Sequence, residues 1–114
     1  MKRRTLIALG ITAAFGATTA AYAQATYPER PITMIVPSAP GGTTDFTARL
    51  ISDQLGKALG QPVVVDNKPG GAGNIGNQLV ARAKPDGHTL LLAYSGYQVG
   101  NPHLFKTSGW DPIK

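Results

Sequence analysis

Two glycine-rich segments hold the residues of this chain whose types and spacing suit chemistry. The first reads PSAPGGTTD over residues 37–45, and the second reads NKPGGAGNIG over residues 67–76. Each follows an apolar, β-branched run and precedes a helical pattern, so each is expected to join a strand to the start of a helix. Backbone N–H groups at a helix N-terminus lie at the positive end of the helix dipole and favour anions. The pattern therefore predicts a binding site for a small anion.

The donors for such an anion are expected from three places. Residues 41–44 offer backbone amides and two threonine hydroxyls to a carboxylate, and residues 71–74 offer a second set. Ser95 follows a third predicted strand, so its hydroxyl would lie at the same edge of the sheet. The alternative interpretation is that the glycines only make tight turns.

The residues GAGNIG at 71–76 match the G-x-G-x-x-G spacing of dinucleotide-binding sites, but their surroundings differ. In such a site the first glycine closes the strand-to-helix turn directly, whereas Asn67–Gly70 intervene here. No acidic residue follows about 20 positions later at the end of the next predicted strand, because Asp86 comes too early. Neither segment ends in the Gly-Lys-Ser/Thr of a phosphate-binding loop. The pattern is therefore unlike a nucleotide cofactor site.

No catalytic or metal-binding constellation stands out in the sequence. His88 precedes a predicted strand and His103 lies in the C-terminal part, and neither has a partner at metal-ligand or triad spacing. Both are expected to be surface residues. Ser38 and Ser95 lack the strained turn that presents a nucleophilic serine. The sequence therefore predicts a binding protein that is not an enzyme and holds no metal or cofactor.

Three strands and two helices are predicted to position these residues. The strands are expected at 32–36, 63–65 and 89–93, and one helix begins after each glycine-rich segment. The order β-α-β-α-β implies an α/β fold with a parallel sheet and right-handed crossovers. A polar loop is expected over residues 94–101.

Each predicted helix has a proposed cap and one apolar face. Thr43 or Thr44 is the expected N-cap of the first helix, and Asp45 lies in its first turn, where it complements the helix dipole or orients the loop. Gly60 is expected to end that helix, and Asn74 to cap the second. The apolar faces comprise Phe46, Leu50, Ile51, Leu55, Ala58 and Leu59 in the first helix, and Ile75, Leu79, Val80 and Ala83 in the second.

The chain has 114 residues and a formal net charge of +5, but part of that charge lies at the N-terminus. Basic residues 2–4, an apolar stretch over 6–17 and the small-x-small residues 21–23 have the layout of a secretory signal peptide. Removal of residues 1–23 would leave 8 basic and 6 acidic residues. No basic stripe for a nucleic acid remains. The absence of cysteine excludes disulfides.

The motifs around the two segments resemble one known family. The stretches YPERPITMIVPSAPGGTTDFTARLI and LGQPVVVDNKPGGAGNIGNQLVARAKPDGHTLLLA resemble the solute-binding proteins of tripartite tricarboxylate transporters, also called the Bug family. The shared motifs are a Pro-Gly-Gly-x-x-Asp loop, a Gly-Gln-Pro strand entry, an Asn-x-Pro-Gly loop and a Pro-Asp-Gly turn. The similarity extends over residues 27–114.

This resemblance implies the partial first lobe of a two-lobed periplasmic binding protein that closes on its ligand like a flytrap. It implies small organic acids as ligands and membrane permease subunits as partners. Where the family often has Phe-Pro after the first strand's proline, this chain has Ser38-Ala39, which alters the size and polarity of the pocket. Matched by position, the ligand-binding residues are Ser38, Gly41, Gly42, Thr43, Thr44, Asp45, Gly70, Gly71, Ala72, Gly73, Asn74 and Ser95.

Members of that family are much longer than this chain. Residues 24–114 are therefore expected to be the N-terminal part of the first lobe, without the second lobe, from a truncated gene or a partial sequence. An alternative hypothesis is an exported ligand-binding module that feeds a signalling partner instead of a permease. Both hypotheses use the same pocket.

Overall fold

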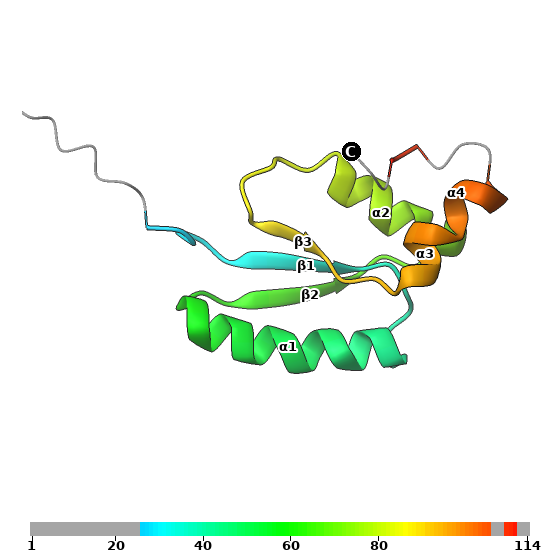
Figure 1. Cartoon of the computed structure of the whole chain (residues 1–114). Helices are drawn as coiled ribbons and strands as arrows, with labels where there is room; N and C mark the ends of the chain where they lie inside the picture. The colour runs from blue at the N-terminus through cyan, green and yellow to red at the C-terminus, as the bar shows by residue number, and fades with distance from the viewer. Residues whose placement is uncertain (1–25, 106–108, 112–114) are drawn as a thin grey trace, which may run out of the picture.

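The computed structural model of the chain describes residues 26–105 and 109–111. In chain order its elements are β1 (Ile32–Val36), α1 (Thr43–Leu59), β2 (Val63–Asn67), the short 3-10 helix η1 (Gly71–Gly73), α2 (Asn74–Ala81), β3 (Thr89–Leu91), α3 (Ser95–Val99) and α4 (Asn101–Leu104) (Figure 1). The predicted signal peptide lies outside the described residues. In the part of the chain that is described, no helix has the length and apolarity needed to cross a bilayer.

The three strands form one parallel sheet in the order β2-β1-β3. β1 pairs along both of its edges, so that Met34 lies opposite Val65 of β2 and Leu90 of β3. α1 lies against one face of the sheet and α2 lies against the other (Figure 1). The predicted α/β fold with a β-α-β-α-β order and a parallel sheet is confirmed. Because β2 and β3 lie on opposite sides of β1, the strand order reverses there, and open α/β sheets bind ligands at such a point.

Strand β1 forms the centre of the core because both of its edges and both of its faces are covered. Ile32, Ile35 and Val36 are at most 2% exposed. Met34 and Val36 pack with Ala48 of α1. The apolar run of β1 is thus explained by burial on both faces, as is typical of a parallel sheet. The partly buried side chains around this cluster are Leu55, Val63, Val65, Leu90 and Leu92.

Helix α1 approaches the sheet with its small residues. Ala48 and Ser52 are buried, and a Cβ added at Gly56 would lie 3.2 Å from the Gln61 carbonyl oxygen. Small residues spaced four apart let the helix come close to the strands, and Leu55 packs beside them. The predicted apolar face is therefore wrong at four of its six positions, which are exposed: Phe46, Leu50, Ile51 and Ala58.

Helix α2 shows the same preference for small residues at the contact. Gly76 is buried, and an added Cβ there would lie 2.7 Å from Pro37 Cβ, so only glycine allows this approach. Asn77 is buried as well. Ile75 and Leu79, which were predicted to face the core, are exposed.

Several boundaries differ from the prediction. β2 continues through Asp66 and Asn67, because both residues pair with β1. β3 ends at Leu91, two residues before the predicted end, and α2 ends before Ala83. The predicted loop over residues 94–101 instead forms α3 and begins α4, where local backbone hydrogen bonds close the helical turns.

We expect Ile35→Ala to lower the free energy of unfolding by about 2–5 kcal/mol, because it removes a buried side chain and leaves a cavity. Ile51→Ala deletes the same atoms from the exposed side of α1 and should change stability by less than about 0.5 kcal/mol. Urea unfolding of the two variants and the unmodified chain measures the difference. Equal losses in both variants would contradict the position of the core.

Candidate functional site

The carboxyl ends of all three strands meet at one edge of the sheet, and both glycine-rich loops leave from that edge (Figure 1). The first loop, residues 37–42, follows β1, and the second loop, residues 68–73, follows β2. Asn67 Nδ2 at the end of β2 donates a hydrogen bond to the Ser38 carbonyl oxygen at 3.1 Å. The two loops are therefore adjacent, as expected from the parallel order.

Gly42, and neither Thr43 nor Thr44, is the N-cap residue of α1. Its backbone is extended, with φ −81° and ψ 172°, and no side chain caps the first turn. The predicted threonine cap was wrong because the helix starts at Thr43, so both threonines lie inside its first turn. The first N–H groups of a helix have no partner within the helix. They are the donors that an anion would use.

A pocket of about 220 Å³ lies between the start of α1 and the end of β3. Three threonines of α1 form one wall, and residues 92–94 form a mainly apolar wall. Among the described residues, its lining includes no lysine or arginine. Ser95 is exposed at the start of α3, directly after this second wall. The lining residues are Thr43, Thr44, Thr47, Leu92, Ala93 and Tyr94.

A larger hollow of about 510 Å³ lies at the other end of α1, around Gly60 and Pro62. It contains none of the predicted ligand-binding residues. Gly60 ends α1 in the left-handed conformation with φ 72°, as predicted, and its N–H donates to the Gly56 carbonyl oxygen. The smaller pocket is therefore the candidate site, because it lies where a parallel sheet presents its loops.

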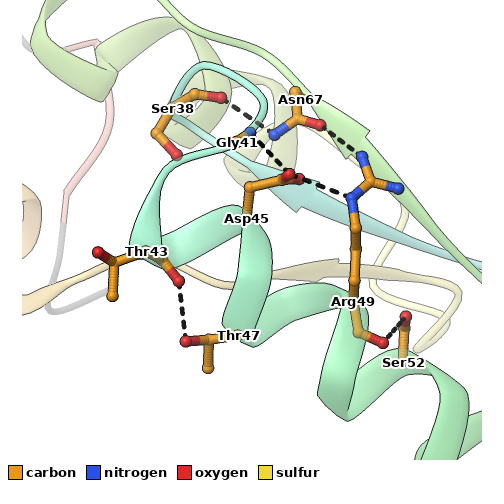
Figure 2. Close-up of polar contacts among 8 residues, drawn as sticks. All are labelled: Ser38, Gly41, Thr43, Asp45, Thr47, Arg49, Ser52 and Asn67. Carbon is orange, nitrogen blue, oxygen red and sulfur yellow. Dashed lines mark hydrogen bonds and ion pairs between the residues drawn. The ribbon is translucent and has the colours of Figure 1, made fainter.

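Asp45 holds the first loop from within the first turn of α1 (Figure 2). Its Oδ2 atom accepts hydrogen bonds from Gly41 N–H at 2.9 Å and from Arg49 Nε at 3.1 Å. Arg49 Nη2 donates to Asn67 Oδ1 at 3.3 Å, and Asn67 Nδ2 donates to the Ser38 carbonyl oxygen. We call these five residues the Asp45 relay. It joins the start of α1, the end of β2 and the first loop.

The Asp45 relay favours the ionised carboxylate. The hydrogen bond from the Arg49 guanidinium, followed by the one from the Gly41 amide, lowers the pKa of Asp45 from 3.8 to about 2, although burial acts in the opposite direction. Asp45 is only 4% exposed. Its Oδ1 atom and Ser38 Oγ are buried and have no hydrogen-bond partner among the described residues. Ordered water is the usual way to satisfy such atoms.

The second loop is held by residues that come later in the chain. Its Ala72 has φ +52°, which is uncommon for a residue with a Cβ atom. Asn101 Nδ2 donates to the Ala72 carbonyl oxygen at 2.7 Å and to Asn74 Oδ1 at 3.2 Å. Trp110 Nε1 donates to the same Asn74 oxygen at 2.9 Å. The predicted capping role of Asn74 was wrong, because Gly73 is the N-cap of α2 and the Asn74 side chain contacts the C-terminal segment.

Two predicted donors of the second loop are used within the protein. Gly73 N–H donates to the Gly70 carbonyl oxygen at 3.0 Å, and Asn74 N–H bonds the Gly71 carbonyl oxygen. The Tyr97 ring covers Gly73, where an added Cβ would lie 2.8 Å from ring carbons. Burial raises the pKa of that tyrosine. The second loop is therefore left with fewer free amides than residues 70–74 suggested.

Three residues that shape the site were not among the sequence candidates. Arg49 lies four positions after Asp45, a spacing typical of helical ion pairs, so a search for such pairs would have found it. Asn67 ends β2 and was taken only as the first residue of a loop. Asn101 gives no local signal, because its partner Ala72 is 29 residues away.

The predicted surface position of His88 was wrong. His88 is 5% exposed and precedes β3, at the opposite end of the sheet, where its ring lies edge-on to Tyr27 at 5.1 Å. Its backbone N–H donates to Asp86 Oδ1 and lowers the pKa of that carboxyl. His103 is exposed, as predicted. Across residues 26–105 and 109–111, no group of three or more histidine, aspartate or glutamate side chains could hold a metal ion.

Residues 47–114 match the family described as "Tripartite tricarboxylate transporter family receptor". A UPF0065 protein of Bordetella bronchiseptica is 50% identical over 95 residues, which cover 83% of this chain and 28% of that protein. Protein BugT of Bordetella pertussis is 48% identical over 92 residues, which cover 81% of this chain and 28% of BugT. The chain thus spans 28% of the length of each of these curated relatives.

Solved structures share the fold. The periplasmic binding protein BugD has a TM-score of 0.72 and 48% identity, with 75% of this chain and 28% of that chain covered. Rpa4515 of R. palustris with adipate has a TM-score of 0.74 and 40% identity, and the match covers 77% of this chain and 29% of that chain. MatC of Rhodopseudomonas palustris with bound malate has a TM-score of 0.74 and 41% identity, and the match covers 77% of this chain and 30% of that chain. The described sheet and helices therefore form part of a periplasmic binding protein fold, as predicted.

The carboxyl of Asp45 should titrate with a midpoint near 2. Because its folded pKa lies below the unfolded value, the resulting stability is fully present above about pH 4 and is lost as the pH falls through 2. The stability difference between the unmodified chain and Asp45→Asn should therefore shrink over that range. Carbon-detected NMR of the carboxyl and urea unfolding at several pH values measure both effects. A midpoint near 4 would contradict the Asp45 relay.

Proposed function

Because the chain belongs to the tripartite tricarboxylate transporter receptor family, we propose that it captures a small organic acid in the periplasm for delivery to membrane permease subunits. Capture of this kind needs no covalent chemistry. The family supplies the class of protein, and the fold supplies the edge of the sheet at which a ligand would bind. Two structural neighbours are described with adipate and with malate, both small carboxylates.

The observation that carries the proposal is the start of α1. Its first turn lacks a side-chain cap, and Thr43 and Thr44 from that turn line a pocket beside the end of β3. The sheet order reverses at the same place. Helix N-termini and reversal points are the two features with which α/β folds bind small anions.

Neutral donors would hold the carboxylate. The first contacts are the amides of Gly42, Thr43 and Thr44 with the two threonine hydroxyls, and Ser38 would reach the ligand through ordered water. The apolar wall that includes Leu92 suits the carbon skeleton of an organic acid. Residues 70–74 and the Ser95 hydroxyl would complete the site, with the second loop contributing the amides that its own turn does not use.

Enclosure of the ligand would require more than this pocket. Small-molecule sites bury most of a ligand's surface, whereas the pocket between α1 and β3 is not enclosed. A second lobe that closes over the first loop would provide the missing wall. The proposal therefore assigns to this chain the recognition of one carboxylate group and to the closing lobe the remaining contacts.

Thr43→Pro should weaken binding of adipate or malate to the purified chain by about tenfold or more, because it removes one amide donor to a charged group. The helix should persist, since proline is favoured at the first helical position and Gly42 already has the extended backbone that a following proline requires. Thr43→Ala is the matched control, because it keeps the amide and loses only the hydroxyl. NMR titration would locate the site through the shifts of the Gly42 and Thr44 amides.

Three results would contradict the proposal. One is no shift of these amides at millimolar adipate or malate. Another is equal binding by Thr43→Pro and the unmodified chain. The third is a shift confined to the hollow around Gly60.

Export can be tested separately from binding. Expression of the whole chain in a bacterium with an outer membrane should give a periplasmic product that begins at Gln24, because residues 21–23 end the proposed signal peptide. Mass spectrometry of the periplasmic fraction measures the new N-terminus. Replacing Ala23 with a bulky residue should block cleavage there, and recovery of uncleaved cytoplasmic protein from the unmodified sequence would contradict the signal peptide.

A further inference from the structure

The candidate site contains a charge that opposes its proposed ligand. Asp45 lies in the first turn of α1, next to the amides of Gly42, Thr43 and Thr44. A carboxylate held by those amides would lie near the carboxylate of Asp45, and like charges repel more strongly where water is excluded. Asp45 is 4% exposed, so solvent contributes little screening. A carboxylate site with this aspartate beneath it needs a compensating positive charge.

Arg49 supplies that charge in a fixed position. Its Nε donates to Asp45 Oδ2 at 3.1 Å, and its Nη2 donates to Asn67 Oδ1 at 3.3 Å (Figure 2). The guanidinium is therefore held between α1 and the end of β2. Lys68, which lies in the second loop, is 3.1 Å from Asp66 and compensates that carboxylate instead.

A second ion pair on α1 provides a natural comparison. Lys57 lies 2.7 Å from Asp53 with the same spacing of four residues, but both side chains are more than 60% exposed. That pair lies in the C-terminal half of the helix, away from the glycine-rich loops. Exposed pairs of this kind contribute little and are screened by salt. The Arg49 pair differs because its acidic partner is buried.

Resting on the proposed carboxylate capture, we propose that Arg49 is a positioning residue that neutralises Asp45 and so lets the start of α1 accept a second carboxylate. Asp45 then serves to hold the Gly41 amide and is not itself a ligand contact. The glycine-rich loops alone would then not determine the affinity of the site. The affinity would also depend on a cation, Arg49, that does not line the pocket.

The test compares four variants in titrations of adipate and malate at pH 7 and low salt. Arg49→Met should raise the dissociation constant by about tenfold, because it leaves the Asp45 charge uncompensated. The double variant Arg49→Met, Asp45→Asn should return to within about threefold of the unmodified chain, since both charges are gone. Asp45→Asn alone should lower the dissociation constant, because it removes the opposing charge while its amide oxygen can still accept from Gly41 N–H. Lys57→Met, which removes one positive charge from the same helix, should change the constant by less than about twofold.

Thermal unfolding of each variant checks that the fold persists. If Arg49→Met does not fold, the single variant Asp45→Asn still decides: its amide oxygen can still accept from Gly41 N–H, so weaker binding by that variant would show that the Asp45 charge favours the ligand and would overturn the proposal. Failure of the double variant to recover, or an equal loss in Lys57→Met, would also overturn it. Absence of binding by the unmodified chain would instead overturn the proposed function, and with it the proposed role of Arg49.

Discussion

The pairing of β1 with a parallel strand along each edge is the constraint on which the rest of the structure depends. It fixes the direction of all three strands, so that every strand ends at the same edge of the sheet. It also places Ile35 and Val36 in the middle of the sheet, where the elements packed on the two faces bury them. The first and second loops lie next to each other because their strands do. For the same reason, the start of α1 lies beside the end of β3, where the candidate pocket is.

The order of elements could be predicted from the sequence because burial leaves a clear signature. A strand covered on both faces reads as a continuous apolar run, and glycine-rich segments follow two such runs. It was harder to predict which residues of each helix face the core. Spacing rules give weight to large side chains such as Phe46 and Leu50, whereas the observed contacts use Ala48, Ser52 and Gly56. Where α1 lies closest to the sheet its inward residues are small, and Leu55 packs beside them.

The site was predictable where its interactions are local. The first loop and the acidic residue of its helix were found from sequence, and the ion pair of Asp45 with Arg49 has a recognisable spacing. The N-cap residue of α1 could not be predicted, because the position at which α1 starts depends on where the first loop turns. The bonds from Asn101 and Trp110 to the second loop were also out of reach, since they join segments that lie far apart in the chain.

The dependence of the second loop on Asn101 and Trp110 sets an order of assembly for the site. The Gly41–Asp45 hydrogen bond joins residues four apart, so this contact can form as soon as α1 does. The bond from Asn101 to the Ala72 carbonyl oxygen, and the bond from Trp110 to Asn74, need residues that come 29 and 36 positions later in the chain. Local contacts form faster than those that close long loops. One half of this edge is therefore held by contacts local to α1, and the other half depends on a segment that lies outside both glycine-rich loops.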